Sequence, residues 1–471
     1  MKINPLSYLY LFVVGAFLIV TGHLMFAKTM FMDGLFYTTI ARNISVGDCT
    51  VWDLKFTNTF YSNFHEHPPL AMWLESVYFD VFGTSWVVDK FYSVSTYFFT
   101  AFFIHKIWKT IYPTSQLSWV AILFWLFTPV VFWAVGNNLL ENTMSIFLII
   151  SVYYSLKTVL TNKWYYSIIS GFFIALGFLT KGFVAFFPLS FFFIYFLIFK
   201  DFKIKLMIRN SILIIIGTLL PLVLLFSFNH TAYLSIKSYF DIQVVNSLNN
   251  IVTVDSRFFI VKRLLSELLV IFFLIVVLYF ITSKAKINLS KNSFERKWFL
   301  FFTLFGLTGV LPIIVTLKQS GFYILPVYPL FSIAFVSLFN KRLTFFHDKI
   351  VSSLITRYVS IVVFLCGFTM VLFSFSSYGN DSEIVKDIEI ISKYVKKGEI
   401  IDSPTTMSDD FSIHAYLYRM NFISLRSDSE VKNNFYIINL EQDPINKIPN
   451  GYKLIPLKTE VLKLYKKVKF I

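Results

Sequence analysis

The sequence predicts an α-helical polytopic membrane protein with about 11 transmembrane helices, further interfacial helices, and a small C-terminal α/β domain. Of the 471 residues, 56% are hydrophobic and only 15% are charged, whereas soluble domains carry about 25% charged residues. Apolar stretches such as 8–26, 207–228 and 259–282 are long enough to cross a hydrocarbon core of about 30 Å as helices. A β-barrel would alternate with period two instead. Near residue 380 the charge rises and the long apolar runs end.

Each expected span is an apolar stretch of helical length. In chain order the spans are expected at 8–27, 86–107, 118–136, 139–157, 164–180, 182–199, 208–228, 259–282, 298–316, 321–339 and 352–374. The first span is expected to be retained, because it lacks a small-residue cleavage site and its apolar run is long for a signal peptide.

The connecting segments alternate in their content of Lys and Arg. The segments at the N-terminus, 105–116, 157–163, 200–209, 283–297 and 340–351 hold more than twice as many as those at 28–66, 137–141, Lys181, 229–258 and 317–320. The positive-inside rule therefore predicts a cytoplasmic N-terminus and an outer, periplasmic C-terminal domain in a bacterial inner membrane. The same bias explains the net charge of +15, because basic residues of a polytopic protein mark its cytoplasmic side. We therefore expect the lipid bilayer as a partner and no nucleic acid.

The predicted domains are a transmembrane catalytic domain at 1–375, with outer loops at 28–85 and 229–258, and a soluble domain at 376–471. In the first outer loop, an amphipathic run begins at Asp33 and another follows Pro69. Both are rich in aromatic residues and too short or too polar to span, so we expect interfacial helices. The second outer loop is polar and rich in Asn, without clear periodicity.

The C-terminal domain mixes helical and strand patterns. Apolar residues recur every three or four positions from Ile384 to Val395, which predicts a helix. A second helix is expected at 409–419, and short β-like runs lie at 399–401, 422–425, 435–440 and 452–456. Cys49 and Cys366 lie in a surface loop and in a late apolar span, which argues against a disulfide or a metal cluster.

Charged residues gather on the predicted outer face. They are Asp33, Glu66, His67, Glu141, Lys181 and Lys318, each at the outer end of a span or in an outer loop. His65 and His67 are more often interfacial polar residues than metal ligands.

Each of these charges also has a purely structural explanation. Asp33 would cap the helix that follows it, and Glu141 would favour the positive end of a helix dipole. Lys181 would be a turn residue before Gly182, and Lys318 a snorkelling end residue. Together, however, they predict a pocket at the outer membrane face that holds both carboxylates and cations.

Such a pocket suits the chemistry of a lipid-linked sugar phosphate. A carboxylate at the interface can activate an acceptor as a general base, and cations facing it can stabilise a departing phosphate. The lipid tail would lie between helices and the phosphate at headgroup depth. The sequence lacks the Gly-rich phosphate loop of nucleotide-dependent enzymes, which fits energy stored in an activated lipid.

Five short motifs in order resemble the membrane-embedded GT-C glycosyltransferases, and among them the protein O-mannosyltransferase-like subgroup that includes the aminoarabinose transferase. The motifs are Asp33-Gly34 after the first span, Glu66-His67-Pro68-Pro69-Leu70, Leu140-Glu141-Asn142-Thr143-Met144, Gly177-Phe178-Leu179-Thr180-Lys181-Gly182 and Tyr323-Ile324-Leu325-Pro326-Val327-Tyr328-Pro329. The resemblance covers about residues 8–340.

The resemblance implies a glycosyltransferase that moves a hexosyl or pentosyl group from a polyprenyl-phosphate donor to an envelope acceptor: a protein, a lipid or a glycan. It makes Asp33 the catalytic base of one inverting displacement. It makes Lys181, Lys318 and His67 the binding residues of the donor phosphate. Some relatives have Lys where His67 stands, so the charge at this point is expected to depend on pH.

The resemblance further implies that Glu66, Glu141 and Tyr323 bind the sugar or the acceptor. Where a member of this subgroup uses a divalent cation, Glu66 or Glu141 would help to bind it, and no other cofactor is implied. Relatives of the aminoarabinose type carry a Glu-His pair in the second long loop, where this chain reads Val245-Asn246-Ser247-Leu248. That difference argues against a bound metal and against lipid A as the acceptor.

Two non-enzymatic functions stay open from the residues alone. One is a lipid-linked glycan flippase or exporter, and the other is a non-catalytic protein of envelope assembly. A transporter is expected to bury charges within its spans or to pair broken helices. The spans here hold almost no charge at mid-depth, which favours the enzyme.

Overall fold

A computed structural model describes residues 4–245, 252–282, 293–427, 432–443 and 448–468. The chain forms two compact units. The helical unit comprises residues 1–25, 65–71 and 91–375, and the sheet unit comprises 26–64, 72–90 and 376–471. The sheet unit thus combines parts of the predicted first outer loop with the C-terminal segment. The predicted boundary at residue 375, between a catalytic membrane domain and a soluble domain, stays a prediction.

The helical unit consists of long apolar helices, as the sequence predicted. Its helices are α1 (Pro5–Met25), α4 (Trp86–Ile111, whose first turn belongs to the sheet unit), α5 (Ser118–Leu126), α6 (Pro129–Ala134), α7 (Leu140–Thr161), α8 (Tyr165–Lys181), η1 (Gly182–Ser190), α9 (Phe191–Ile198), α10 (Ile204–Phe228), α11 (His230–Tyr239), η2 (Phe240–Val245), α13 (Phe259–Ile281), α14 (Ser293–Thr308), η4 (Leu311–Val315), η5 (Gly321–Val327), α15 (Tyr328–Leu338), α16 (Asn340–Val351) and α17 (Leu354–Ser374).

Eight helical stretches among the described residues are long and apolar enough to cross a membrane. The fold class is therefore confirmed, but the count of about 11 spans is not. Three of the expected spans are not counted separately. The helix α4 is 26 residues long but is not among the eight stretches. Residues 165–198 form one continuous candidate span, and α5 and α6 are two short helices separated at Thr128 and Pro129.

The break before α6 is stabilised by a buried carboxylate. Glu267 of α13 is 2% exposed, and its Oε2 accepts a hydrogen bond from the Val130 backbone N–H at 2.7 Å. It thereby satisfies one of the amides that a helix N-terminus leaves without an intrahelical partner. Arg263 pairs with the other oxygen at 2.5 Å. The sequence reading overlooked this charge within a span, because its role is visible only through the contact with α6.

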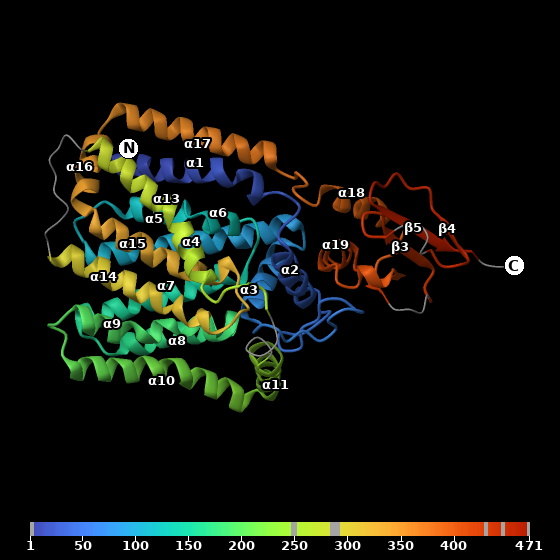
Figure 1. The fold of residues 1–471 in the computed structure, drawn as a ribbon, viewed down its shortest axis with the longest axis horizontal. Coiled ribbons are helices and arrows are strands. Elements are labelled where there is room, and N and C mark those ends of the chain that lie inside the picture. The colour runs from blue at the N-terminus through green and yellow to red at the C-terminus, as the bar shows by residue number, and fades with distance from the viewer. Residues whose placement is uncertain (1–3, 246–251, 283–292, 428–431, 444–447, 469–471) are drawn as a thin grey trace. The chain divides into compact units, whose positions relative to one another are not determined.

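The helices α1 and α17 lie side by side, although they are distant in the sequence (Figure 1). A Cβ on Gly15 would overlap the backbone of Phe364, and a Cβ on Gly367 would overlap the carbonyl oxygen of Gly15. Small residues let helix backbones approach closely in membranes. These two glycines therefore set the spacing between α1 and α17.

The predicted first outer loop contains both helices that the sequence predicted. They are α2 (Met32–Ser45) and α3 (Leu70–Phe82). In α2 the side chains of Ile40 and Ala41 are fully buried, as the amphipathic run required. Their predicted position in the membrane interface stays a prediction.

The described part of the predicted second outer loop is more regular than its sequence indicated. Asn229 accepts a hydrogen bond through Oδ1 from the Ala232 N–H at 3.0 Å, and this cap begins α11. The helix continues into η2. The expectation of a loop without periodicity was wrong, since an Asn that starts a helix was counted only as a polar loop residue. Residues 246–251 lie outside the described residues.

The C-terminal segment folds as a five-stranded sheet with two helices (Figure 1). The strands are β1 (Ile400–Asp402), β2 (Ser424–Arg426), β3 (Phe435–Asn439), β4 (Tyr452–Leu454) and β5 (Leu462–Lys467), the helices α18 (Ser382–Ile391) and α19 (Phe411–Asn421), with a short η6 (Thr405–Met407). The order is β2-β1-β3-β5-β4. β1 is parallel to β2 and β3, and β5 is antiparallel to β3 and β4.

The predicted α/β character of this segment is confirmed, with one strand missed. β5 carries three lysines, Lys463, Lys466 and Lys467, among its six residues, so its composition hid it. Its Leu462 and Leu464 are nevertheless fully buried, because every second side chain of a strand points to the same face.

Candidate functional site

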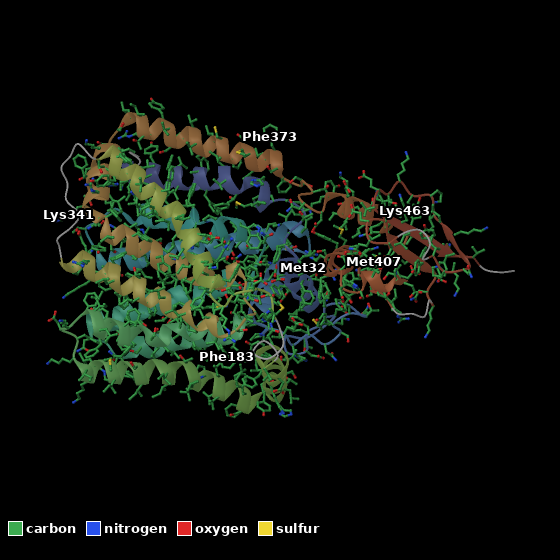
Figure 2. The ribbon with its side chains drawn as sticks, in the orientation of Figure 1. Met32, Phe183, Lys341, Phe373, Met407 and Lys463 are labelled. Carbon is green, nitrogen blue, oxygen red and sulfur yellow. The ribbon has the colours of Figure 1, made fainter. Side chains whose placement is uncertain are left out.

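A cavity of about 290 Å³ in the helical unit brings together four of the predicted site residues. It is lined by His67, Lys181, Phe183, Val184, Tyr239, Gln243, Val244, Pro312, Ile313, Thr316, Lys318 and Tyr323; Phe183 is labelled in Figure 2. These residues come from segments that are far apart in the chain. The motifs that suggested a phosphate-binding pocket therefore meet at one place.

Lys181 forms a buried ion pair with Glu141. The ammonium contacts Oε1 of Glu141, and the two side chains are 8% and 0% exposed. Glu141 lies in the first turn of α7, where the helix dipole favours a negative charge, and Lys181 is the last residue of α8. The dipole explanation for Glu141 is thus compatible with a second role, which is to hold the ammonium in place.

Aromatic rings complete the surroundings of the Lys181 ammonium. Its Nζ lies 4.7 Å from the ring centroid of Tyr323 and 5.4 Å from that of Phe322. A cation over an aromatic face gains about 0.5–2 kcal/mol. Tyr323, predicted to bind substrate, is therefore positioned to orient the lysine as well.

The chain turns directly after Lys181, as the sequence suggested. Gly182 has a φ of +79°, a conformation that favours glycine. A Cβ at this position would also overlap the Tyr239 hydroxyl. Any larger residue would therefore disturb both the backbone turn and the cavity wall.

Lys318 is presented by a turn that Gln319 holds in place. Gln319 is 2% exposed; its Oε1 accepts from the Ile260 N–H at 2.9 Å, and its Nε2 donates to the carbonyl oxygens of Arg257 and Thr316, both at 2.8 Å. The Lys318 N–H donates to Thr316 Oγ1 at 3.0 Å. The backbone at Lys318 is therefore fixed by hydrogen bonds. A residue that only snorkels at the end of a span would not need such a fixed backbone.

His67 is neutral in this setting. The residue is partly exposed, but its Nδ1 atom is buried. Desolvation, together with the nearby cations Lys181 and Lys318, lowers the pKa of the imidazole well below its usual range. Near pH 7 the ring can donate one hydrogen bond to an anion but adds no positive charge. The expected pH dependence of this charge therefore lies at more acidic pH than for an ordinary histidine.

Sequence reasoning missed three polar residues of the cavity: Tyr239, Gln243 and Thr316. Tyr239 is 5% exposed, and burial raises the pKa of its hydroxyl to about 12, so it remains a neutral donor. Its position was readable in principle, because Ala232, Ser235 and Tyr239 are the buried residues of α11 and recur at helical spacing.

Asp33 belongs to the sheet unit, and it does not start its helix. Phe31 is the N-cap of α2 and provides no side-chain hydrogen bond. Asp33 is half-buried in the first turn. The explanation of Asp33 as the N-cap residue is therefore wrong, and its proposed role as a base stays a prediction.

The remaining predicted residue, Glu66, is half-buried and next to His67, but it is not among the lining residues. Among the described residues, no group of three or more His, Cys, Asp or Glu side chains could hold a metal ion. Of the stretch compared with the Glu-His pair, Val245 ends η2, and 246–248 lie outside the described residues. The divalent cation stays a prediction, and no chemical step is derived through it.

Comparison with known sequences confirms the resemblance to this group of glycosyltransferases. Residues 66–229 match the family described as dolichyl-phosphate-mannose-protein mannosyltransferase. Over 158 residues, the chain is 28% identical to undecaprenyl phosphate-alpha-4-amino-4-deoxy-L-arabinose arabinosyl transferase 1 of Proteus mirabilis. This match covers 32% of the chain and only 28% of that relative's length.

The fold as a whole is similar to solved structures. ArnT from Cupriavidus metallidurans bound to undecaprenyl phosphate has a TM-score of 0.64 at 13% identity, with 98% of each chain covered. Its apo state gives 0.62 at 13% identity, with 95% and 96% covered. The apo oligosaccharyltransferase of Archaeoglobus fulgidus gives 0.51 at 9% identity, over 92% of this chain and 70% of that one. The fold is therefore an ArnT-like one, and the chain is a multi-pass membrane protein.

Proposed function

We propose that this protein is a glycosyltransferase of the bacterial inner membrane. It transfers a sugar from a polyprenyl-phosphate donor to an envelope acceptor on the outer face, with inversion and with Asp33 as base. The observation that carries the proposal is the cavity where His67, Lys181, Lys318 and Tyr323 meet. The matched family and the matched relative both bear the names of enzymes that use lipid-phosphate sugars, which supports the donor class.

The charges of the cavity fit a departing phosphate better than a bound donor. A polyprenyl-phosphate sugar is a phosphodiester with one negative charge, whereas the polyprenyl phosphate that leaves is a monoester that gains a second. Glu141 already balances Lys181 in part, so Lys318 and the N–H of His67 meet the additional charge. Interactions that strengthen as charge develops raise the rate of the chemical step.

The proposed reaction is a single displacement at the anomeric carbon. The bond from that carbon to the phosphate oxygen breaks, and its electron pair leaves with the lipid phosphate. A bond to the acceptor's hydroxyl or amine forms on the opposite face, and the acceptor's proton passes to the Asp33 carboxylate. Glu66, Glu141 and Tyr323 orient the sugar or the acceptor.

Mass analysis of envelope glycoproteins, lipids and glycans, with and without this protein, tests the function. One hexose or pentose mass is expected to disappear from one acceptor class. Asp33→Asn is expected to abolish transfer in membranes that contain normal amounts of the protein. Asp53→Asn, which changes another carboxylate of the same loop, serves as the matched control and is expected to transfer normally. Transfer at the wild-type rate by Asp33→Asn would refute the assignment of the base.

A further inference from the structure

Within the sheet unit, one arginine of α2 is inserted into the end of α19. Arg42 is 1% exposed. Its Nη1 donates to the carbonyl oxygens of Tyr418 and Arg419, both at 2.9 Å, and its Nη2 donates to Asn43 Oδ1 at 2.8 Å. Arg42 and its two carbonyl partners are more than 370 residues apart in the sequence.

The end of α19 is a suitable receptor for a guanidinium. The last carbonyls of a helix carry the negative end of the helix dipole. The Tyr418 carbonyl oxygen also accepts from the Phe422 N–H at 2.8 Å, and its second lone pair is available to the guanidinium. Phe422 follows α19 in the left-handed conformation, with φ 56°, and its ring centroid lies 3.7 Å from the Arg42 guanidinium. The planar fork of arginine can donate two N–H groups to carbonyls while its flat face stacks on a ring, whereas an ammonium has no planar face.

The guanidinium remains charged in this buried position. Desolvation and the charge of Arg419 lower the pKa of Arg42 to about 9. At neutral pH its positive charge therefore still meets the helix end, and the carbonyls take the place of a carboxylate partner.

Two neighbours at the same helix end make parallel connections. The Tyr418 hydroxyl donates to Asp48 Oδ2 at 2.7 Å. Arg419 pairs with Asp89 at 2.7 Å and donates to the Thr84 carbonyl oxygen at 2.8 Å. The last turn of α19 thus contacts α2, the segment that follows α2, and the start of α4, all within one compact unit.

Aromatic packing connects the middle of α2 to the same helix. Phe36 stacks on Phe56 at a centroid distance of 3.8 Å and lies 6.3 Å from Phe411 of α19. Phe60 lies 5.2 Å from Phe411. The α2 helix is therefore held along most of its length, while its first turn has no side-chain cap.

We propose that the C-terminal sheet domain is a positioning element for the helix that bears Asp33, and that Arg42 is its principal positioning residue. Asp33 and Arg42 lie on the same 14-residue helix, about 13 Å apart along its axis. A helix of this length moves as a rigid body, so fixing its end at Arg42 fixes the direction in which Asp33 is presented. The inference rests on the proposed function, because it takes Asp33 to be the base.

Steady-state kinetics of Arg42→Lys and Arg42→Gln test this role. Arg42→Gln is expected to lower kcat at least about tenfold, which corresponds to about 1.4 kcal/mol of transition-state stabilisation. The KM for the donor is expected to stay within about twofold, since the cavity lies in the other unit. Arg42→Lys is expected to recover part of the loss. Arg209→Lys changes a partly exposed arginine of the helical unit that donates to Asn162 at 3.1 Å and serves as the matched control.

Hydrogen exchange separates positioning from general destabilisation. In Arg42→Gln, the backbone amides of 32–45 are expected to exchange faster while those of the helical unit are unchanged. If the Arg42 variants do not accumulate as folded protein, Tyr418→Phe provides a milder change, because it removes only one hydroxyl, which donates to Asp48 Oδ2 at 2.7 Å and lies 3.3 Å from Asn58 Oδ1. It is then expected to lower kcat about threefold at constant donor KM, a loss of about 0.7 kcal/mol.

The outcomes distinguish the two proposals. A folded Arg42→Gln protein with wild-type kcat, or one with only a raised donor KM, would overturn the positioning role even though Asp33→Asn is inactive. The same holds for Tyr418→Phe in the milder test. Activity of Asp33→Asn would overturn the proposed function itself, whatever the Arg42 variants do.

Discussion

Replacing Glu141 by glutamine removes one charge of a buried pair and leaves its shape almost unchanged. The Lys181 ammonium is then left 8% exposed without the carboxylate that now contacts it. Breaking a buried pair by removing one partner costs about 3–5 kcal/mol. The rings of Tyr323 and Phe322 remain near the ammonium and offset about 0.5–2 kcal/mol of this. We therefore expect Glu141→Gln to lower the free energy of unfolding by about 1–4.5 kcal/mol.

The anion of the donor provides a sharper readout than stability alone. In Glu141→Gln, a bound phosphate would replace the lost negative charge beside Lys181. Polyprenyl phosphate is therefore expected to raise the unfolding midpoint of Glu141→Gln more than that of the wild type, measured in detergent micelles. Stabilisation by a ligand grows with its affinity and concentration, so both proteins are titrated over the same range.

A double-mutant cycle completes the test. Glu141→Gln with Lys181→Met removes both charges, and it is expected to be more stable than Glu141→Gln alone by at least about 1.5 kcal/mol. Additive effects of the two substitutions would show that the pair contributes no coupling. An equal response of wild type and Glu141→Gln to polyprenyl phosphate would refute the placement of the phosphate beside Lys181.

Two further predictions concern the other walls of the cavity. The pKa of His67 is lowered in the folded protein, so as the pH falls through about 6.5 the unfolded chain binds a proton before the folded protein does, and folding stability falls. His67→Gln is expected to lose this part of the pH dependence of thermal unfolding between pH 7.5 and 5.5. An unchanged dependence of the unfolding midpoint on pH would contradict this prediction. Gln319→Glu places a carboxylate against the carbonyl oxygens of Arg257 and Thr316 and thereby disturbs the turn that presents Lys318. The donor KM is therefore expected to rise about tenfold, or about 1.4 kcal/mol, with kcat little changed. Gln116→Glu, at an exposed position, is its control, and an unchanged donor KM in Gln319→Glu would show that the turn does not depend on this side chain.

The sequence allowed the fold class and most of the cavity to be predicted because both are encoded locally. Continuous apolar runs identify membrane helices, and the alternating loop charges suggested which motifs share a face. His67, Lys181, Lys318 and Tyr323 do meet in one cavity. The sidedness itself and the roles of these residues stay predictions.

The parts that could not be predicted depend on contacts between distant segments. Gln319 looked like an ordinary polar residue, and its importance appears only through its bonds to residues 257 and 260. Glu267 was overlooked as well, and its role appears only through its hydrogen bond at the N-terminus of α6. Arg42 likewise carries no local sign of its partners in α19. No helical or strand periodicity contains such information.

The close approach of α1 and α17 has a consequence for biosynthesis. Gly15 faces Gly367, so α1 finds its packing partner only after some 350 further residues have been made. During that interval its glycine face must tolerate lipid or provisional contacts with other helices. A chain interrupted before α17 would therefore insert but expose this face, which is a feature that membrane quality control could recognise.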